Sequence, residues 1–145
     1  MNHNATKRGA CYALLIVCQI AAAFLPFLAV ISLSIASKLY IWMPGISLNY
    51  ELYSSWMYIL PCLSALCLAL ACVKTVRSLS SGKPLGYGSL LAALLALLAD
   101  CALCVSCVKG GPFFGAAIIV WPLLAAILNF CSMFLIVSLN LDNPE

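Results

Sequence analysis

The chain has 145 residues, of which 66% are hydrophobic and only 8% are charged, and its formal net charge is +3. A soluble domain carries about 25% charged residues, so these few charges cannot cover a water-exposed surface. The same values exclude a disordered chain and an ordinary nucleic-acid-binding protein, which needs a larger basic footprint. The composition therefore predicts an integral membrane protein, with few acid–base groups left for an enzyme.

Four apolar runs are long enough to cross a hydrocarbon core, which takes roughly 20 helical residues. They cover residues 11–35, 54–73, 88–108 and 113–139. We expect an all-α fold, a bundle of four antiparallel transmembrane helices forming a single domain over residues 1–145. Three runs contain a proline, where neighbouring helices can satisfy the freed carbonyls, so we expect kinks and not breaks at Pro26, Pro61 and Pro122.

The basic residues are distributed unequally between the two predicted sides of the membrane. One side holds both termini and the connection between the second and third runs, with Lys7, Arg8, Lys74, Arg77 and Lys83. The other side holds Lys38 and Lys109. Because basic residues are enriched in cytoplasmic loops, both termini are expected in the cytoplasm, in the plasma (inner) membrane of a bacterium.

The connection between the first and second runs is rich in aromatic residues. They are Tyr40, Trp42, Tyr50, Tyr53 and Trp56. Tyrosine and tryptophan concentrate at membrane–water interfaces, so we interpret this segment as an outer interfacial belt. The alternative is a docking surface for an extracellular ligand or partner.

The third run has a small, weakly polar face and a leucine face. At 100° per residue, the small face contains Gly86, Ser89, Ala93, Ala96, Asp100, Cys104 and Cys107, and the opposite face contains Leu91, Leu94 and Leu98. Membrane helices pack closely through small residues. We therefore expect the small face to point into the bundle.

Asp100 is the only acidic or basic side chain inside any of the four runs. An intramembrane carboxyl is costly and is a functional candidate by default. Its candidate partners are the neutral amides of Asn129 and Gln19, and desolvation favours its neutral form. Two hypotheses stay open: a proton- or cation-coupled site, or a protonated carboxyl that fixes helix packing.

All nine cysteines lie inside the runs. Residues 101–104 and 104–107 match C-x-x-C formally, so a redox role for Cys104 and Cys107 is a remote alternative. Free cysteine otherwise packs as a small, nearly hydrophobic residue. Three cysteines along one helix cannot surround a metal, so we expect no metal and no cofactor.

The segment 74–88 between the second and third runs is predicted as a cytoplasmic hairpin, turned by Gly82 and Pro84. Its cations Lys74, Arg77 and Lys83 attract anionic lipid headgroups. The hairpin is expected to be a topology-setting connector, or alternatively a docking site for a cytoplasmic protein.

This hairpin, and the outline of the whole chain, resemble an uncharacterised bacterial family of four-helix membrane proteins. The shared features are a basic helix end, a short Ser/Gly–Lys turn and a Leu-Pro-rich first span, here residues 25–28. The chain departs from the family at Leu85, where an aromatic is usual, and in its shorter acidic tail. Such genes often neighbour small helix-turn-helix regulators, so the resemblance implies membrane-tethered control of transcription.

The sequence thus favours a small multi-pass membrane protein without enzymatic activity that binds another protein in a regulatory, immunity or accessory role. The alternative is a small oligomeric proton- or cation-coupled transporter or channel that uses Asp100. A membrane thiol oxidoreductase is the third hypothesis. The expected partners are the lipid bilayer, a membrane or cytoplasmic protein and a second copy of the chain, but no nucleic acid.

Overall fold

The computed structural model describes residues 3–40, 56–109 and 119–141. Within these ranges the chain forms four helices, α1 (His3–Tyr40), α3 (Trp56–Ser81), α4 (Gly86–Lys109) and α6 (Val120–Leu141). Each contains a stretch long and apolar enough to cross a membrane: Ala5–Ser32, Ile59–Ser81, Gly86–Ser106 and Val120–Leu141. The all-helical prediction with four membrane-spanning candidates is confirmed.

Two helix ends lie farthest beyond the predicted boundaries. α1 begins at His3, and α3 continues to Ser81. The connection between α3 and α4 is therefore only residues 82–85, and the prediction of a loop from residue 74 was wrong. Hydropathy locates the segment that lipid can cover, whereas a helix ends where its backbone hydrogen bonding ends. α3 ends just before Gly82, and α4 begins at Gly86. The φ angles of these two residues, 70° and 74°, suit glycine.

The prolines do not break the helices. α1 continues through Pro26 and α3 through Pro61. Pro122 is the third residue of α6, where a missing N–H costs little because first-turn N–H groups have no intrahelical partner. A kink inside the fourth helix is therefore not required at Pro122, and residues 113–118 of the predicted run lie outside the described residues.

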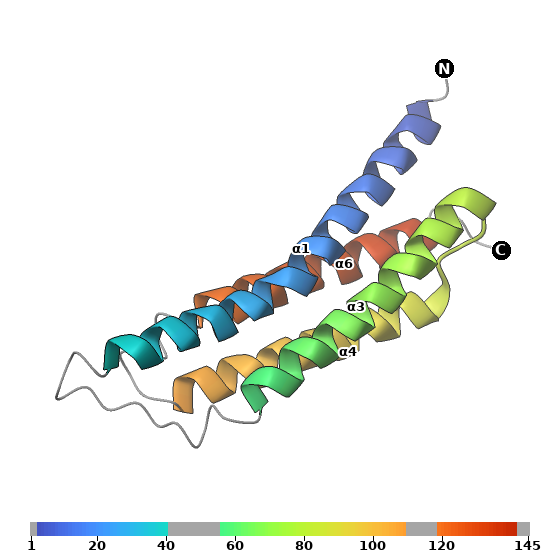
Figure 1. The fold of residues 1–145 in the computed structure, drawn as a ribbon. Helices are drawn as coiled ribbons and strands as arrows, with labels where there is room; N and C mark the ends of the chain where they lie inside the picture. Colours follow the sequence, from blue (N-terminus) through green and yellow to red (C-terminus); the bar gives the residue numbers. More distant parts are fainter. Residues whose placement is uncertain (1–2, 41–55, 110–118, 142–145) are drawn as a thin grey trace.

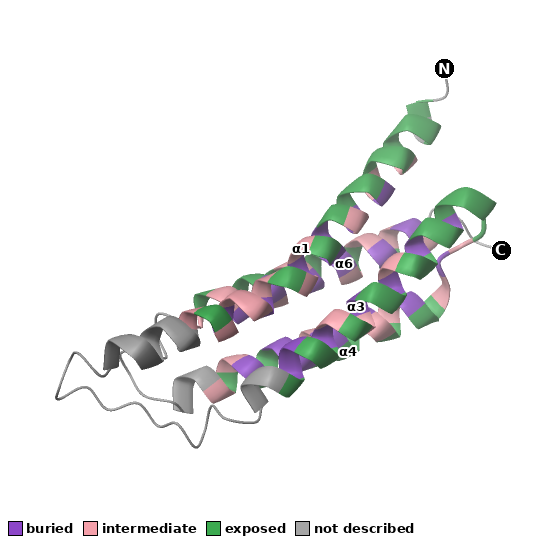
Figure 2. Ribbon diagram, viewed as in Figure 1, coloured by how far each residue is buried: buried purple, intermediate pink, exposed green. Residues whose placement is uncertain are grey.

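Each helix packs against two neighbours: α1 and α4 both contact α3 and α6. Figure 1 shows this arrangement, with the first turns of α1 pointing away from the other helices. Figure 2 shows buried residues along the surfaces where the helices meet and exposed residues on the outside. The outside is apolar, as a lipid-facing surface requires.

The predicted orientation of α4 is confirmed. Ser89, Ala93, Ala96 and Asp100 are buried, while Leu91, Leu94 and Leu98 are exposed. Lipid tails are as apolar as the helix surfaces, so the hydrophobic effect does not drive helices together in a membrane. Helix association depends instead on close packing and interhelical hydrogen bonds. Small residues on α4 allow that close approach.

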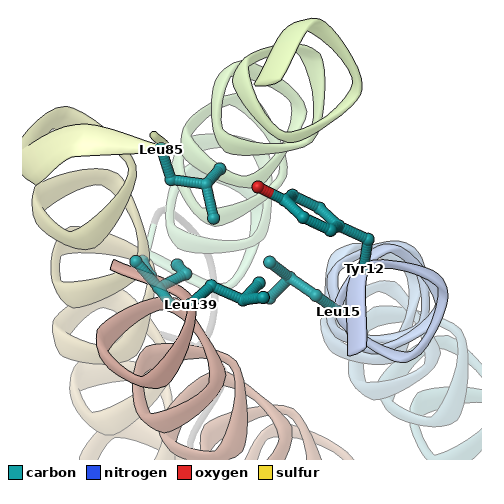
Figure 3. Packing of buried hydrophobic residues seen from close by; sticks show 6 residues of the cluster. Tyr12, Leu15, Leu85 and Leu139 are labelled. Atoms are coloured by element: carbon teal, nitrogen blue, oxygen red, sulfur yellow. The ribbon is translucent and has the colours of Figure 1, made fainter. Parts of the chain in front are cut away.

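One apolar cluster closes an end of the bundle. It contains Tyr12, Leu15, Leu85, Ala93, Ile136 and Leu139. Figure 3 shows the side chains of Tyr12, Leu15, Leu85 and Leu139 pointing toward one another. A second cluster joins Ala22, Leu68 and Ala96 farther along the bundle.

Candidate functional site

The Asp100 carboxyl lies at a junction of three helices. It projects from the small face of α4 and has no exposed surface. Its Oδ1 accepts a hydrogen bond from the Ser64 hydroxyl of α3 at 3.1 Å. Its Oδ2 accepts one from the Asn129 side-chain amide of α6 at 2.5 Å. We call Asp100, Ser64 and Asn129 the polar junction.

The predicted contact between Asp100 and Asn129 is therefore present, and Ser64 is a partner that the sequence analysis missed. Ser64 and Asn129 are both fully buried. Ser64 shares the inward face of α3 with Leu60 and Leu68, spaced four residues apart. A small polar residue at this spacing is the same signal that identified the inner face of α4.

Gln19 is buried, but its described hydrogen bond is with Thr75 and not with Asp100. The Thr75 hydroxyl lies 2.8 Å from the Ala71 carbonyl oxygen and 3.3 Å from Gln19 Oε1. A hydroxyl has one hydrogen and can donate to only one of these acceptors at a time. Gln19 and Thr75 thus form a separate polar contact between α1 and α3.

Three buried side-chain amide atoms have no hydrogen-bond partner among the described residues. They are Gln19 Nε2, Asn129 Oδ1 and Asn140 Oδ1. A buried polar atom without a partner costs about 1–3 kcal/mol. In the polar junction, the unpaired atom is an acceptor carried by the same amide that donates to Asp100.

The predicted cytoplasmic cations lie on ordered elements. Lys7 and Arg8 are on α1, Lys74 and Arg77 on α3, and Lys83 in the turn. We call these five residues the basic end. Lys7, Lys74, Arg77 and Lys83 are exposed and Arg8 is half-buried.

A chain of contacts connects the elements of the basic end. The Arg8 guanidinium carbon lies 5.8 Å from the centre of the Tyr12 ring, within the range of a cation–π contact. The Tyr12 and Ser78 hydroxyls are 2.9 Å apart, and Ser78 donates to the Lys83 carbonyl. Since Ser78 has one hydrogen, Tyr12 is the donor in their bond.

The turn is fixed further by its backbone. The Gly82 N–H donates to the Ser78 carbonyl at 2.9 Å. Across the turn, the Lys74 ammonium occupies the space where a side chain at Gly88 would start. The backbone bond thus closes the end of α3, and the Lys74 side chain contacts the start of α4 across the turn.

The remaining predicted residues are placed as follows. The side chains of the interfacial belt, from Tyr40 to Trp56, lie outside the described residues, and so does Cys107. The eight cysteines whose side chains are described, Cys104 included, are free thiols. No group of three or more histidine, cysteine or acidic residues suited to a metal is found in the described ranges.

Comparison with known proteins adds no relative. No protein-family model matches the chain. No curated protein and no solved structure matches it either. The resemblance of the hairpin to a bacterial four-helix family therefore stays a prediction.

Proposed function

We propose that this chain is a small multi-pass membrane protein without enzymatic activity, which acts by binding another protein at its basic end. In this proposal the four helices form one antiparallel bundle in the plasma (inner) membrane of a bacterium. Both termini and the basic end face the cytoplasm. The bound protein exerts, or receives, a regulatory, immunity or accessory effect.

Two contacts between α1 and α6 support the antiparallel arrangement. Near one end of the bundle, Tyr12 packs in the same cluster as Leu139. Near the other, the Trp121 indole donates to the Ser32 hydroxyl at 2.9 Å. An early residue of α1 thus meets a late residue of α6, and the reverse. The excess of cations at one end supports its cytoplasmic placement.

The observation that carries the binding proposal is the chain of contacts from Arg8 through Tyr12 and Ser78 to Lys83. It holds cations from α1, α3 and the turn on helical or hydrogen-bonded backbone. A surface whose backbone is already ordered loses less conformational entropy on binding. The basic end is therefore suited to a partner with a fixed pattern of charges.

The chemistry of the basic end selects an acidic protein surface. Attraction to anionic lipids requires only cations near the headgroups and would be served equally by an irregular loop. The ordered hairpin offers more than charge, because Lys74 lies on α3 and Lys83 lies in a turn whose backbone accepts a hydrogen bond from Ser78. Complementary charges on a folded partner would also speed association.

The test is site-specific photocrosslinking in membranes of the native host. A photoreactive residue at Arg77 should give one discrete adduct containing a second, acidic protein, identified by mass spectrometry. Raising the salt concentration should reduce the adduct, because exposed charges are screened. The matched control is Leu66 on the same helix, which is 60% exposed on the apolar surface.

Lys83→Gln should reduce by several fold the yield of the protein adduct formed by the photoreactive residue at position 77. Cysteine accessibility at both ends must first show that this variant keeps its orientation, because a lost cation can alter topology. Adducts of lipid alone, or equal protein adducts at Arg77 and Leu66, would refute the proposal. An adduct with a second copy of the chain would replace it with self-association.

A further inference from the structure

The polar junction holds a carboxyl group without a counter-ion in the described part of the chain. The lysines and arginines whose side chains are described all belong to the basic end, whereas Asp100 contacts Ser64 and Asn129. α4 packs against α3 and α6, and the free thiols on these three helices include Cys101 and Cys104 of α4, Cys67 of α3 and Cys131 of α6. None is a base that could neutralise a carboxylate as a cation would.

Counting hydrogens shows which form of Asp100 the described contacts satisfy. Ser64 donates to Oδ1 and Asn129 donates to Oδ2. Both carboxyl oxygens therefore act as acceptors, which suits the ionised form. A protonated carboxyl has an O–H of its own and needs one acceptor in place of one of these donors.

That acceptor is already present on Asn129. Its Oδ1 is fully buried and has no partner among the described residues. Turning the amide by 180° exchanges its nitrogen and oxygen, so that Oδ1 faces Asp100 and can accept the carboxyl proton. The Ser64 hydroxyl donates to Asp100 whether the carboxyl is ionised or protonated. Rotation of the Asn129 amide alone therefore supplies the donor that the carboxylate needs or the acceptor that the acid needs.

We propose that Asp100 is a reversible proton-binding site in which the Asn129 amide turns with the protonation state, donating to the carboxylate and accepting from the acid. The bound proton forms an O–H bond on Asp100, and its release leaves the carboxylate with two donors. The site is independent of the basic end and of any protein bound there.

A proton fits this site better than a metal cation does. Hard divalent cations take about six or more oxygen ligands. The polar junction brings together three oxygen-bearing side chains, and the unpaired amide atom of Gln19 is a nitrogen. A proton requires one acceptor and one donor position, and both are present.

Infrared spectroscopy can observe Asp100 directly because the chain has only four acidic side chains. Glu51→Gln, Asp142→Asn and Glu145→Gln together leave Asp100 as the only one. This variant is reconstituted in phosphatidylcholine vesicles, and difference spectra are recorded across a pH series. The carbonyl band of a protonated carboxyl should appear on acidification, disappear on return to alkaline pH, and be absent after Asp100→Asn.

The Asn129 amide is tested in the same background. Its carbonyl band should shift together with the Asp100 band, and Asn129→Leu should remove that shift and move the Asp100 midpoint to higher pH. Ser64→Ala should move the midpoint in the same direction, because each change removes a donor to the carboxylate. Asn140→Leu is the matched control, since it removes another α6 amide whose oxygen is buried, from a half-buried residue that has no described contact with Asp100.

Circular dichroism confirms that each variant is folded, and Ser64→Ala decides the question if Asn129→Leu does not fold. An Asp100 band that is constant across the whole pH series would overturn the proposal. So would a midpoint that Ser64→Ala and Asn129→Leu leave unchanged. Loss of the band on adding sodium chloride at constant pH would assign the site to a metal cation instead.

Discussion

Replacing Asn129 with leucine should destabilise the bundle more than its single described hydrogen bond implies. Leucine has the same branched shape and number of side-chain heavy atoms but cannot donate to Asp100, so the change leaves a buried carboxyl oxygen without a partner. Phe130, the next residue, is 66% exposed on the apolar surface. Phe130→Leu is therefore the matched control.

The magnitude follows from what each variant leaves unpaired. Interhelical hydrogen bonds in membranes contribute about 0.6 kcal/mol on average, and at most about 1.7 kcal/mol. A buried acceptor that is left without a donor costs about 1–3 kcal/mol. We expect Asn129→Leu to lower the free energy of unfolding by about 1–3 kcal/mol. Phe130→Leu should change it by no more than about 0.5 kcal/mol.

Asp100→Asn separates the two contributions. An asparagine at this position can accept from Ser64 and donate to Asn129 Oδ1 once that amide has turned. Its cost should therefore stay below about 1 kcal/mol. A cycle of Asn129→Leu with Asp100→Leu, each of which removes the hydrogen bond between the two side chains, gives their coupling energy. We expect it at about 0.6–1.7 kcal/mol.

The assay is reversible unfolding in mixed micelles, or steric trapping in bicelles, followed by tryptophan fluorescence. All four proteins of the cycle are measured at one pH and one detergent composition. Equal stabilities for Asn129→Leu and Phe130→Leu, with no coupling to Asp100, would refute the reasoning. That result would mean that the Asp100 carboxyl replaces the lost Asn129 donor with another partner at no cost in stability.

Three further changes test the hairpin. Tyr12→Phe removes the donor to Ser78 and should cost about 1 kcal/mol, with faster hydrogen exchange in residues 82–86. Gly86→Ala places a side chain at a φ of 74° and should cost about 1–2 kcal/mol, measured as a lower unfolding midpoint. Gly88→Ala displaces only the flexible end of Lys74, so stability should hold while labelling of that amine by an acylating reagent increases. Unchanged labelling would contradict the described contact.

The sequence identifies the inner face of α4 well because composition and periodicity agree there. Small residues recur on one side and leucines on the other, and the structure buries and exposes them accordingly. Asp100 lies on the small face, so its proximity to some polar residue of a neighbouring helix follows. Asn129 is a plausible partner from sequence because α6 has few other polar residues in its middle.

The remaining contacts depend on how far each helix is shifted along the bundle relative to its neighbours. The sequence does not specify these shifts. Gln19 meets Thr75 because α1 is placed beside α3 at that level. Ser64 has the correct spacing along α3, but only the packing of α3 against α4 brings it to Asp100. The helix end at Ser81 escaped prediction because the sequence becomes polar from Lys74 onward while the helix continues.

The four-residue turn between α3 and α4 has a consequence for biogenesis. A hairpin this tight can leave the translocon as one unit, and its own Ser64 can donate to Asp100 while the carboxyl enters the lipid. The second donor, Asn129, belongs to α6, which is synthesised after α3 and α4. The buried carboxyl can thus have one donor when the hairpin enters the bilayer, and α6 supplies the other.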